Sequence, residues 1–272
     1  MFGRGTRRPW GKRAAGCLGV AFIAAVYVSL AAPPSHANTA DRLLSNVRKA
    51  ARFRTVSLHV DMVLVDRVGQ KRERSFDWYA THAPGRSKGL IIIDAPDSMK
   101  GTKYLVVTQG HRRTQYVYLP SMHRVRRLGV TELGESFLGS DLNYGDLNDH
   151  GYRSWHNSIL REDLCPEEHV RCAVVQSLPA KQSGGAPPYS RVVQWIRSTD
   201  NIPVYATFYR GKVIIKTLRV QATRSVDGHT IATRTIIRNP VTGHSTRIIV
   251  SRIVLDRPLA DSLFTVRSLE QP

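Results

Sequence analysis

Short runs in which apolar and polar residues alternate fill most of the chain between residues 56 and 255. Residues 56–63 and 76–80 show this pattern near the start, and residues 245–255 show it near the end. Turn-forming pairs such as Asp227-Gly228 separate the runs at short intervals. Because period-two alternation with frequent turns is typical of antiparallel strands joined by hairpins, we predict about eleven strands. They would form one mainly β domain built on a large curved sheet or barrel.

One helix is predicted ahead of these strands. Apolar residues recur at helical spacing from Asp41 to about Arg52, and Thr39 or Asp41 could cap the first turn. At the other end of the chain, residues 259–265 predict a short helix or turn that docks its large apolar side chains.

The first 37 residues have the pattern of an export signal. Five basic residues and no acid flank an apolar run from Ala14 to Ala32, and Ser35-His36-Ala37 provides the small residues that a signal peptidase reads. We therefore predict cleavage before Asn38. The pair Arg7-Arg8 leaves export by Sec and by Tat both open. The alternative is a retained anchor, because the apolar run is about the minimum length of a spanning helix.

Cleavage would leave one domain, residues 38–272, and would lower the formal net charge from +19 to +14 because five basic residues are removed. That length suffices for a single domain with its own core. A strongly basic chain can indicate nucleic acid as a partner, but export argues against it. Outside the cytoplasm the anionic partners are lipid headgroups, membrane surfaces and acidic proteins.

Two cysteines, Cys165 and Cys172, lie in the predicted mature chain. They flank a short segment between two strand-like runs, so the thiols could meet across the neck of a hairpin. In an oxidising compartment a disulfide is the default expectation. A metal site or a reactive thiol is the alternative, with His169 as the nearby histidine.

The stretch from Tyr116 to Leu147 joins an aromatic strand ending in Leu-Pro to a basic run, a Gly-Ser-Asp turn and a tyrosine-acidic segment. It resembles the central signature of the LolA-like outer-membrane lipoprotein-sorting proteins, in which "YLP…RVRR" leads into "F-x-GSD-x-x-Y-x-DL". The matching residues are Tyr118-Leu119-Pro120, Arg124 to Arg127, Phe137, Gly139-Ser140-Asp141, Tyr144 and Asp146-Leu147.

The resemblance implies a curved antiparallel sheet, an incomplete barrel wrapped around one or a few helices, whose concave face is apolar. It also implies a periplasmic carrier, not an enzyme, that takes lipid or acylated lipoprotein from an inner-membrane transporter or exporter towards the outer membrane, with no cofactor or metal. Any of the wall residues that we expect could instead be ordinary core. These wall residues are Trp78, Ile92, Tyr104, Val106, Tyr116, Tyr118, Phe137 and Phe208.

The basic clusters have three interpretations. They could form a rim for anionic headgroups or an acidic partner, or solvated strand edges that discourage aggregation. They could also pair internally, with an arginine of the run binding Asp141 or Asp146. Gly139-Ser140-Asp141 predicts a turn in which the serine or the aspartate caps the next segment. The arginines concerned are Arg112, Arg113, Arg124, Arg126 and Arg127.

Two rival functions stay open. A lipid- or lipoprotein-sensing regulatory module of the same fold would engage a signalling partner, although such relatives usually carry a second domain. A lipid enzyme is disfavoured, because Ser140 lacks the glycine-flanked elbow of a hydrolase nucleophile. The histidines form no H-x-x-x-H or H-E-x-x-H pair that would indicate a metal enzyme.

Overall fold

The computed structural model describes residues 36–51, 53–110, 112–129, 131–147, 155–180 and 189–271. Thirteen strands occur in this part of the chain. Their bounds are β1 (Thr55–Val65), β2 (Lys71–Ala83), β3 (Arg86–Ala95), β4 (Lys103–Gln109), β5 (Arg112–Leu119), β6 (Arg124–Arg127), β7 (Trp155–Leu164), β8 (Arg171–Pro179), β9 (Arg191–Arg197), β10 (Pro203–Arg210), β11 (Val213–Val226), β12 (His229–Asn239) and β13 (His244–Leu255).

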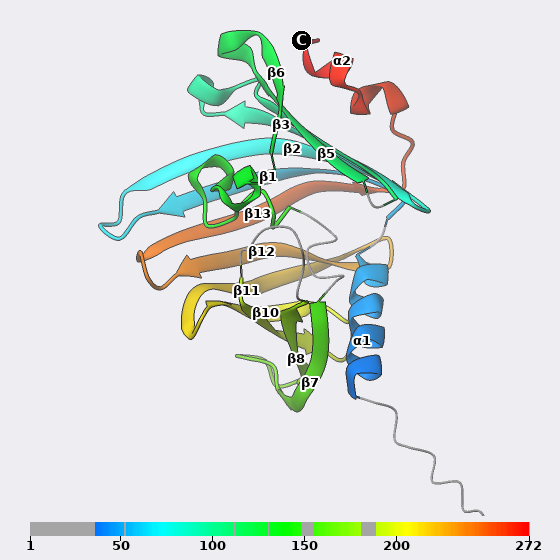
Figure 1. Cartoon of the computed structure of the whole chain (residues 1–272), viewed down its shortest axis with the longest axis vertical. Helices are drawn as coiled ribbons and strands as arrows, with labels where there is room; N and C mark the ends of the chain where they lie inside the picture. Colours follow the sequence, from blue (N-terminus) through cyan, green and yellow to red (C-terminus); the bar gives the residue numbers. More distant parts are fainter. Residues whose placement is uncertain are drawn as a thin grey trace, which may run out of the picture. The chain divides into compact units, whose positions relative to one another are not determined.

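All thirteen strands belong to one antiparallel sheet, in the order β6-β5-β4-β3-β2-β1-β13-β12-β11-β10-β9-β8-β7. Figure 1 shows the sheet bending along this order. Within the described residues, the end strands β6 and β7 do not pair with each other, so the sheet is not closed. The predicted fold class is therefore confirmed, although the sheet has thirteen strands rather than about eleven.

The basic run Arg124–Arg127 supplies one strand that the sequence pattern did not predict. It forms β6, which pairs with residues 116–119 of β5 at one edge of the sheet. Alternation of apolar and polar residues is absent from this strand because three of its four residues are arginines. Their exposed charges suit an edge strand, where they oppose pairing with another chain.

Helix α1 (His36–Ala50) begins at His36 rather than at Asp41, so the predicted cap at Thr39 or Asp41 is wrong. Asp41 instead accepts a hydrogen bond from Asn157 Nδ2 at 2.8 Å. The helix packs Ala40 and Leu44 against Val175 of β8 and Ile196 of β9. The predicted export signal lies outside the described residues as far as residue 35, and its cleavage stays a prediction. None of the described helices is both long and apolar enough to cross a membrane.

The C-terminal segment covers the convex face of the sheet over β3 and β4. It contains η5 (Asp261–Phe264) and α2 (Val266–Leu269), which Thr265 and Ser268 cap reciprocally. Phe264 and Leu269 are buried against Leu90 and Leu105. Figure 1 shows this segment near β3 and β5. The predicted docking of the tail is confirmed.

Short helical turns cover part of the concave face. Of these, η4 (Phe137–Gly139) packs there, η3 (Thr131–Gly134) precedes it in the chain, and η1 (Asp97–Met99) and η2 (Pro120–Met122) connect strands. Phe137 is 1% exposed and meets the ring of Phe76 edge-on, with ring centroids 5.8 Å apart. It also packs edge-on against Tyr144 at 5.5 Å. With the ring of Tyr104 6.2 Å from that of Phe137, these aromatic contacts hold the segment over β2 and β4.

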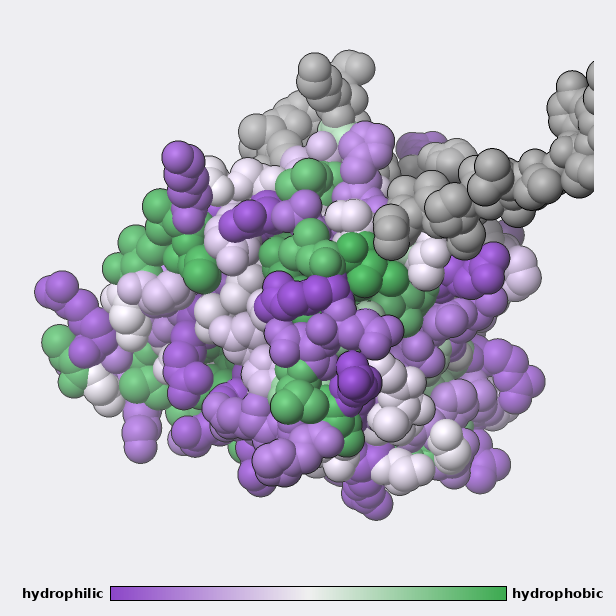
Figure 2. Space-filling view, turned by 90° about the horizontal axis from the view of Figure 1, so that it is seen from below, coloured by the Kyte–Doolittle hydropathy of each residue, from purple (hydrophilic) through white to green (hydrophobic). Residues whose placement is uncertain are grey.

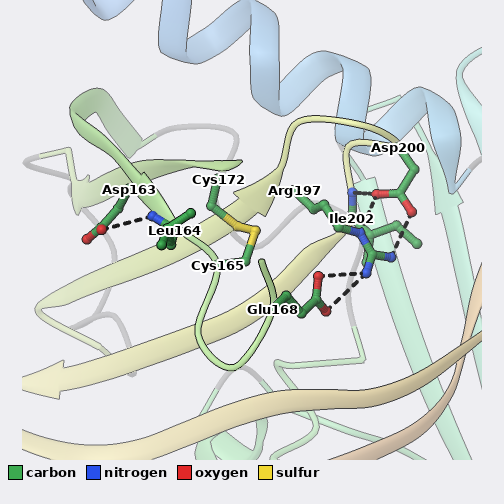
Figure 3. The surroundings of a disulfide bond; sticks show 8 residues. All are labelled: Asp163, Leu164, Cys165, Glu168, Cys172, Arg197, Asp200 and Ile202. Atoms are coloured by element: carbon green, nitrogen blue, oxygen red, sulfur yellow. Dashed lines mark hydrogen bonds and ion pairs between the residues drawn. A yellow bond between two sulfur atoms is a disulfide. The ribbon is translucent and has the colours of Figure 1, made fainter. Parts of the chain in front are cut away.

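The β7–β8 hairpin carries the predicted disulfide between Cys165 and Cys172, whose Cα atoms are 5.0 Å apart (Figure 3). The bridged loop presents Glu168, which accepts hydrogen bonds from Arg197 Nη1 at 2.9 and 3.0 Å. Asp200 binds the other side of the same guanidinium at 2.8 and 3.0 Å. These bonds raise the pKa of Arg197 above its usual value, with the bond to Asp200 contributing most. The loop is thereby tied to the β9–β10 turn.

Candidate functional site

A cavity of about 550 Å³ lies on the concave side of the sheet. Its wall is formed by alternate residues of β1 to β4, by parts of β11, β12 and β13, and by the end of α1. Leu142 and Leu147, from the segment that follows η4, cover part of it. The volume falls within the range of roughly 300–1,000 Å³ that is usual for small-molecule sites.

Strand register explains why the wall is apolar. On β1 the side chains that share the concave face are Val56, Leu58, Val60 and Met62. Leu58 lies opposite Trp78 of β2, and Trp78 lies opposite Ile91 of β3. Since directly opposed residues are in side-chain contact, successive strands extend one continuous apolar surface.

Polar side chains gather at one end of this wall, namely His82, Ser87, Thr108 and Arg113. Arg113 interacts with Tyr104, whose hydroxyl donates a hydrogen bond to Gln115. Burial raises the pKa of Tyr104, and the positive charge of Arg113 opposes this shift. The cavity therefore has an apolar region and a polar end with a permanent positive charge.

Three of the predicted wall residues, Trp78, Tyr104 and Val106, line the cavity. Phe137 and Phe208 are buried beside it without lining it. Phe137 belongs to the cover described above, and the ring of Phe208 packs against Tyr189 with centroids 4.8 Å apart. Whether any of these residues binds a ligand stays a prediction.

The expectation that Ile92, Tyr116 and Tyr118 share a face with Tyr104 is wrong. Tyr104 lies opposite Val117, so the two tyrosines that flank Val117 point to the convex face. There they pack, with Ile92, in the cluster that the C-terminal segment covers. A shift of one residue in register moves a side chain to the other face, and the sequence of one strand does not reveal its register with the next.

Internal pairing with Asp141 or Asp146, one of the three interpretations of the basic run, is not what the described contacts show. Arg126 pairs with Glu132 rather than with Asp141 or Asp146. Asp141, with a side chain 5% exposed, binds the ring of His244 at 2.8 Å, and its backbone N–H donates to Thr246. Asp146 binds Lys216 and the hydroxyl of Tyr189. The described contacts of both acids thus attach the cover of the cavity to β11 and β13.

The Gly139-Ser140-Asp141 turn has the local role that the sequence predicts. Gly139 has a φ of +76°, a conformation that favours glycine. The Ser140 hydroxyl donates to the carbonyl of Phe137 at 2.6 Å and accepts from the N–H of Leu142 at 3.2 Å. Ser140 therefore caps the turn. The sequence disfavours a hydrolase triad of Ser140, Asp141 and His150, and His150 lies outside the described residues.

The basic residues proposed for a rim fall into two groups. Arg112, Arg124, Arg126 and Arg127 are exposed at or near the sheet edge. Arg113 is half-buried and lines the cavity. Sequence reasoning placed Arg113 with the others because the two arginines are adjacent in the chain, and strand alternation separates them.

A separate polar cluster joins β1, β2 and β3. His59 Nδ1 lies 2.7 Å from an Asp77 oxygen and 3.8 Å from Asp94, a spacing that could hold a metal ion. Arg252 contacts the same Asp77 oxygen at 3.3 Å, and the Tyr79 hydroxyl donates to the other at 3.5 Å. With three donors already on Asp77, we interpret the cluster as an ion-pair network.

Sequence reasoning missed most of the wall, including Leu58, Val60, Gly89 and Ile248. The alternation within each strand was visible in the sequence. What it lacked was the register between strands, which decides which alternate set faces the cavity.

A family model described as "uncharacterized protein" matches residues 85–271. The chain belongs to this family. Comparison with curated proteins gave no match. The structure is similar to that of a DUF1329 family protein from Desulfovibrio piger, with a TM-score of 0.80 and 25% identity over 87% of this chain and 100% of that one.

Two further solved structures share the fold. One is a domain from Vibrio parahaemolyticus described as an outer membrane lipoprotein-sorting protein, with a TM-score of 0.75, 22% identity, and coverage of 85% of this chain and 100% of that one. The other is a LolA superfamily protein from Nitrosomonas europaea, with a TM-score of 0.66, 20% identity, and coverage of 84% and 98%. The fold of this protein is therefore LolA-like, as the central motif suggested.

Proposed function

We propose that this protein is a carrier without catalytic activity that binds the hydrocarbon chain of a lipid or an acylated protein in the concave cavity. The observation that carries the proposal is the apolar cavity of about 550 Å³, which the protein's own side chains leave unfilled. The fold that it shares with a domain named for outer membrane lipoprotein sorting and with a LolA superfamily protein supports the same conclusion.

Hydrocarbon burial alone can supply the affinity. Each buried methylene contributes roughly 0.8 kcal/mol, and micromolar binding requires about 8 kcal/mol. A chain with ten or more buried methylenes, on the order of one acyl tail, reaches that level before the entropic cost of association. No reactive group is required for such binding.

The proposed place of action is the periplasm. The predicted signal, residues 1–37, would export the domain that spans residues 38–272. The disulfide between Cys165 and Cys172 suits an oxidising compartment. The carrier would receive its cargo from an inner-membrane transporter or exporter and release it towards the outer membrane.

Hydrophilic side chains cover most of the face seen in Figure 2, with smaller hydrophobic clusters between them.

Mass spectrometry of lipids that copurify with the protein tests the proposal, with a variant that fills the cavity as its partner. Gly89 lines the cavity, and a Cβ there would meet Trp78 Nε1 at an ordinary contact distance of 3.6 Å. Gly89→Leu should therefore fold and displace about three methylenes of ligand, weakening binding of a fluorescent fatty acid by roughly tenfold or more.

The matched control is Gly89→Ala, which adds one methyl group and should have the smaller effect. Acyl lipids should copurify with the wild-type protein and be depleted in Gly89→Leu. Equal amounts of lipid in both proteins, or none in the wild type, would contradict the proposed carrier.

A further inference from the structure

Four polar residues form a continuous row across four neighbouring strands. His82 of β2 lies opposite Ser87 of β3, Ser87 lies opposite Thr108 of β4, and Thr108 lies opposite Arg113 of β5. All four line the cavity. Because opposed residues have Cβ atoms about 5 Å apart, the row is one polar band rather than four separate groups.

The wall changes from polar to apolar along these strands. Two residues further along each strand, the lining contains Ala80, Gly89 and Val106. The next row contains Trp78, Ile91 and Tyr104. From His82 to Phe76 the strand advances roughly 20 Å, at about 3.3 Å per residue. A cavity with this profile matches a molecule that has one polar end and a hydrocarbon tail.

The charge of the row favours an anion. Arg113 is always protonated and has several N–H donors in a planar fork, and the hydroxyls of Ser87 and Thr108 can also donate. Among the described residues that line the cavity, none is Asp or Glu. An anionic group placed at this end therefore meets donors and a positive charge, and the described lining residues bring no carboxylate against it.

We infer that the row of His82, Ser87, Thr108 and Arg113 binds the anionic headgroup, a phosphate or a carboxylate, of the lipid whose tail occupies the apolar region. This inference rests on the proposed carrier function and adds the charge of the cargo and the end of the cavity at which it is bound.

The test compares a pyrene-labelled fatty acid with its uncharged methyl ester, titrated into the purified protein. The wild type should bind the acid about tenfold more tightly than the ester, since a hydrogen bond to a charged group is stronger than one to a neutral group. Arg113→Gln should weaken binding of the acid by about tenfold and leave the affinity for the ester unchanged.

Arg112→Gln is the matched control, because the neighbouring arginine is exposed and does not line the cavity. It should change neither affinity. The comparison of the two probes in the wild type needs no substitution, so a folding defect in Arg113→Gln would not prevent the test. Ser87→Ala, a milder change in the same row, should reduce the preference for the acid in part.

Equal binding of acid and ester by the wild type would overturn the headgroup site while leaving the carrier function intact. Binding of neither probe would overturn both. Excess inorganic phosphate, which has no tail, should leave the bound acid in place. Its displacement by phosphate would assign the row to a free anion and would also overturn the inference.

Discussion

The two faces of strands β2 to β5 carry alternate residues of the same chain segments, yet they are completed differently. On the convex face, Leu90 and Leu105 are buried beneath Phe264 and Leu269 of the C-terminal segment. Lys103 holds that segment by donating to the carbonyls of Ser268 and Gln271. On the concave face, the intervening residues instead border a cavity of about 550 Å³.

The difference shows that strand composition alone does not decide which face becomes a binding site. Both faces are rich in large apolar side chains. One is sealed by a piece of the same chain, whereas the other is covered only in part, by residues 137–147 and the end of α1. A face that the chain does not seal can bind a foreign hydrocarbon. Separate changes to the two faces should therefore affect stability and ligand binding independently.

The largest expected effect is on the stability of the convex face. Phe264 is 3% exposed, and Phe264→Ala should lower the free energy of unfolding by about 3–5 kcal/mol because it leaves a cavity in a packed cluster. Urea unfolding would measure the loss. The affinity of the folded protein for a fatty-acid probe should stay at the wild-type value.

Val266→Ala is a suitable control for this experiment, since Val266 belongs to the same segment and is 41% exposed. It should have little effect on stability. A large loss of probe affinity in Phe264→Ala at temperatures where the protein is folded would mean that the two faces are not independent.

A smaller effect is expected from removal of the disulfide in the β7–β8 hairpin, whose loop contacts Arg197 near the cavity. Replacing both Cys165 and Cys172 by serine should lower the free energy of unfolding by about 2 kcal/mol, because the closed loop is short. Glu168 would lose its fixed position against Arg197, from which the chain continues to the cavity-lining residues Asn201 and Pro203. Thermal unfolding with and without reductant gives the measurement.

The affinity for a fatty-acid probe should fall modestly in the double serine variant, because the bridged loop no longer holds the turn that carries Asn201 and Pro203. In the wild type, thiol labelling should require reductant. Labelling of the native protein without reductant would contradict the disulfide.

The smallest effect concerns the ion pair beside the cover of the concave face. The N–H of Gly129 and then Arg126 hold the pKa of Glu132 below its usual value. Any stability from this interaction is present above the ordinary pKa of glutamate and is lost as the pH falls through the lowered value. Arg126→Gln should raise the pKa of Glu132 only part of the way, because the N–H of Gly129 still donates.

An NMR titration of the Glu132 carboxyl would follow this change. Arg127→Gln, a change at the neighbouring exposed arginine, is the control and should leave the pKa nearer its wild-type value. A complete return of the Glu132 pKa to its usual range in Arg126→Gln would assign the whole shift to the arginine.

Local patterns in the sequence predicted most of the strands, because alternation and turn residues act over a few positions. They also predicted the disulfide, the Gly-Ser-Asp turn and the docking of the tail. They did not predict β6, since a run of arginines at an edge has no apolar face. The start of α1 at His36 was not predicted, because the predicted leader was taken to end at residue 37.

The site was predicted less well than the fold, because it depends on contacts between segments far apart in the chain. Tyr104 and Tyr116 are similar in type and lie on neighbouring strands, but the register places them on opposite faces. Asp146 forms an ion pair with Lys216, which lies seventy positions later in the sequence. Neither relation leaves a signal within a single strand.

Quenching of Trp78 fluorescence by a bromine-labelled fatty acid tests most directly whether a hydrocarbon tail enters the concave cavity. Trp78 lines the cavity, whereas Trp155 and Trp195 pack in other clusters. The wild-type protein should be quenched as the fatty acid binds, and Trp78→Phe should lose most of that quenching while still binding the ligand. Binding without quenching in the wild type, or equal quenching in Trp78→Phe, would contradict a tail held against this wall.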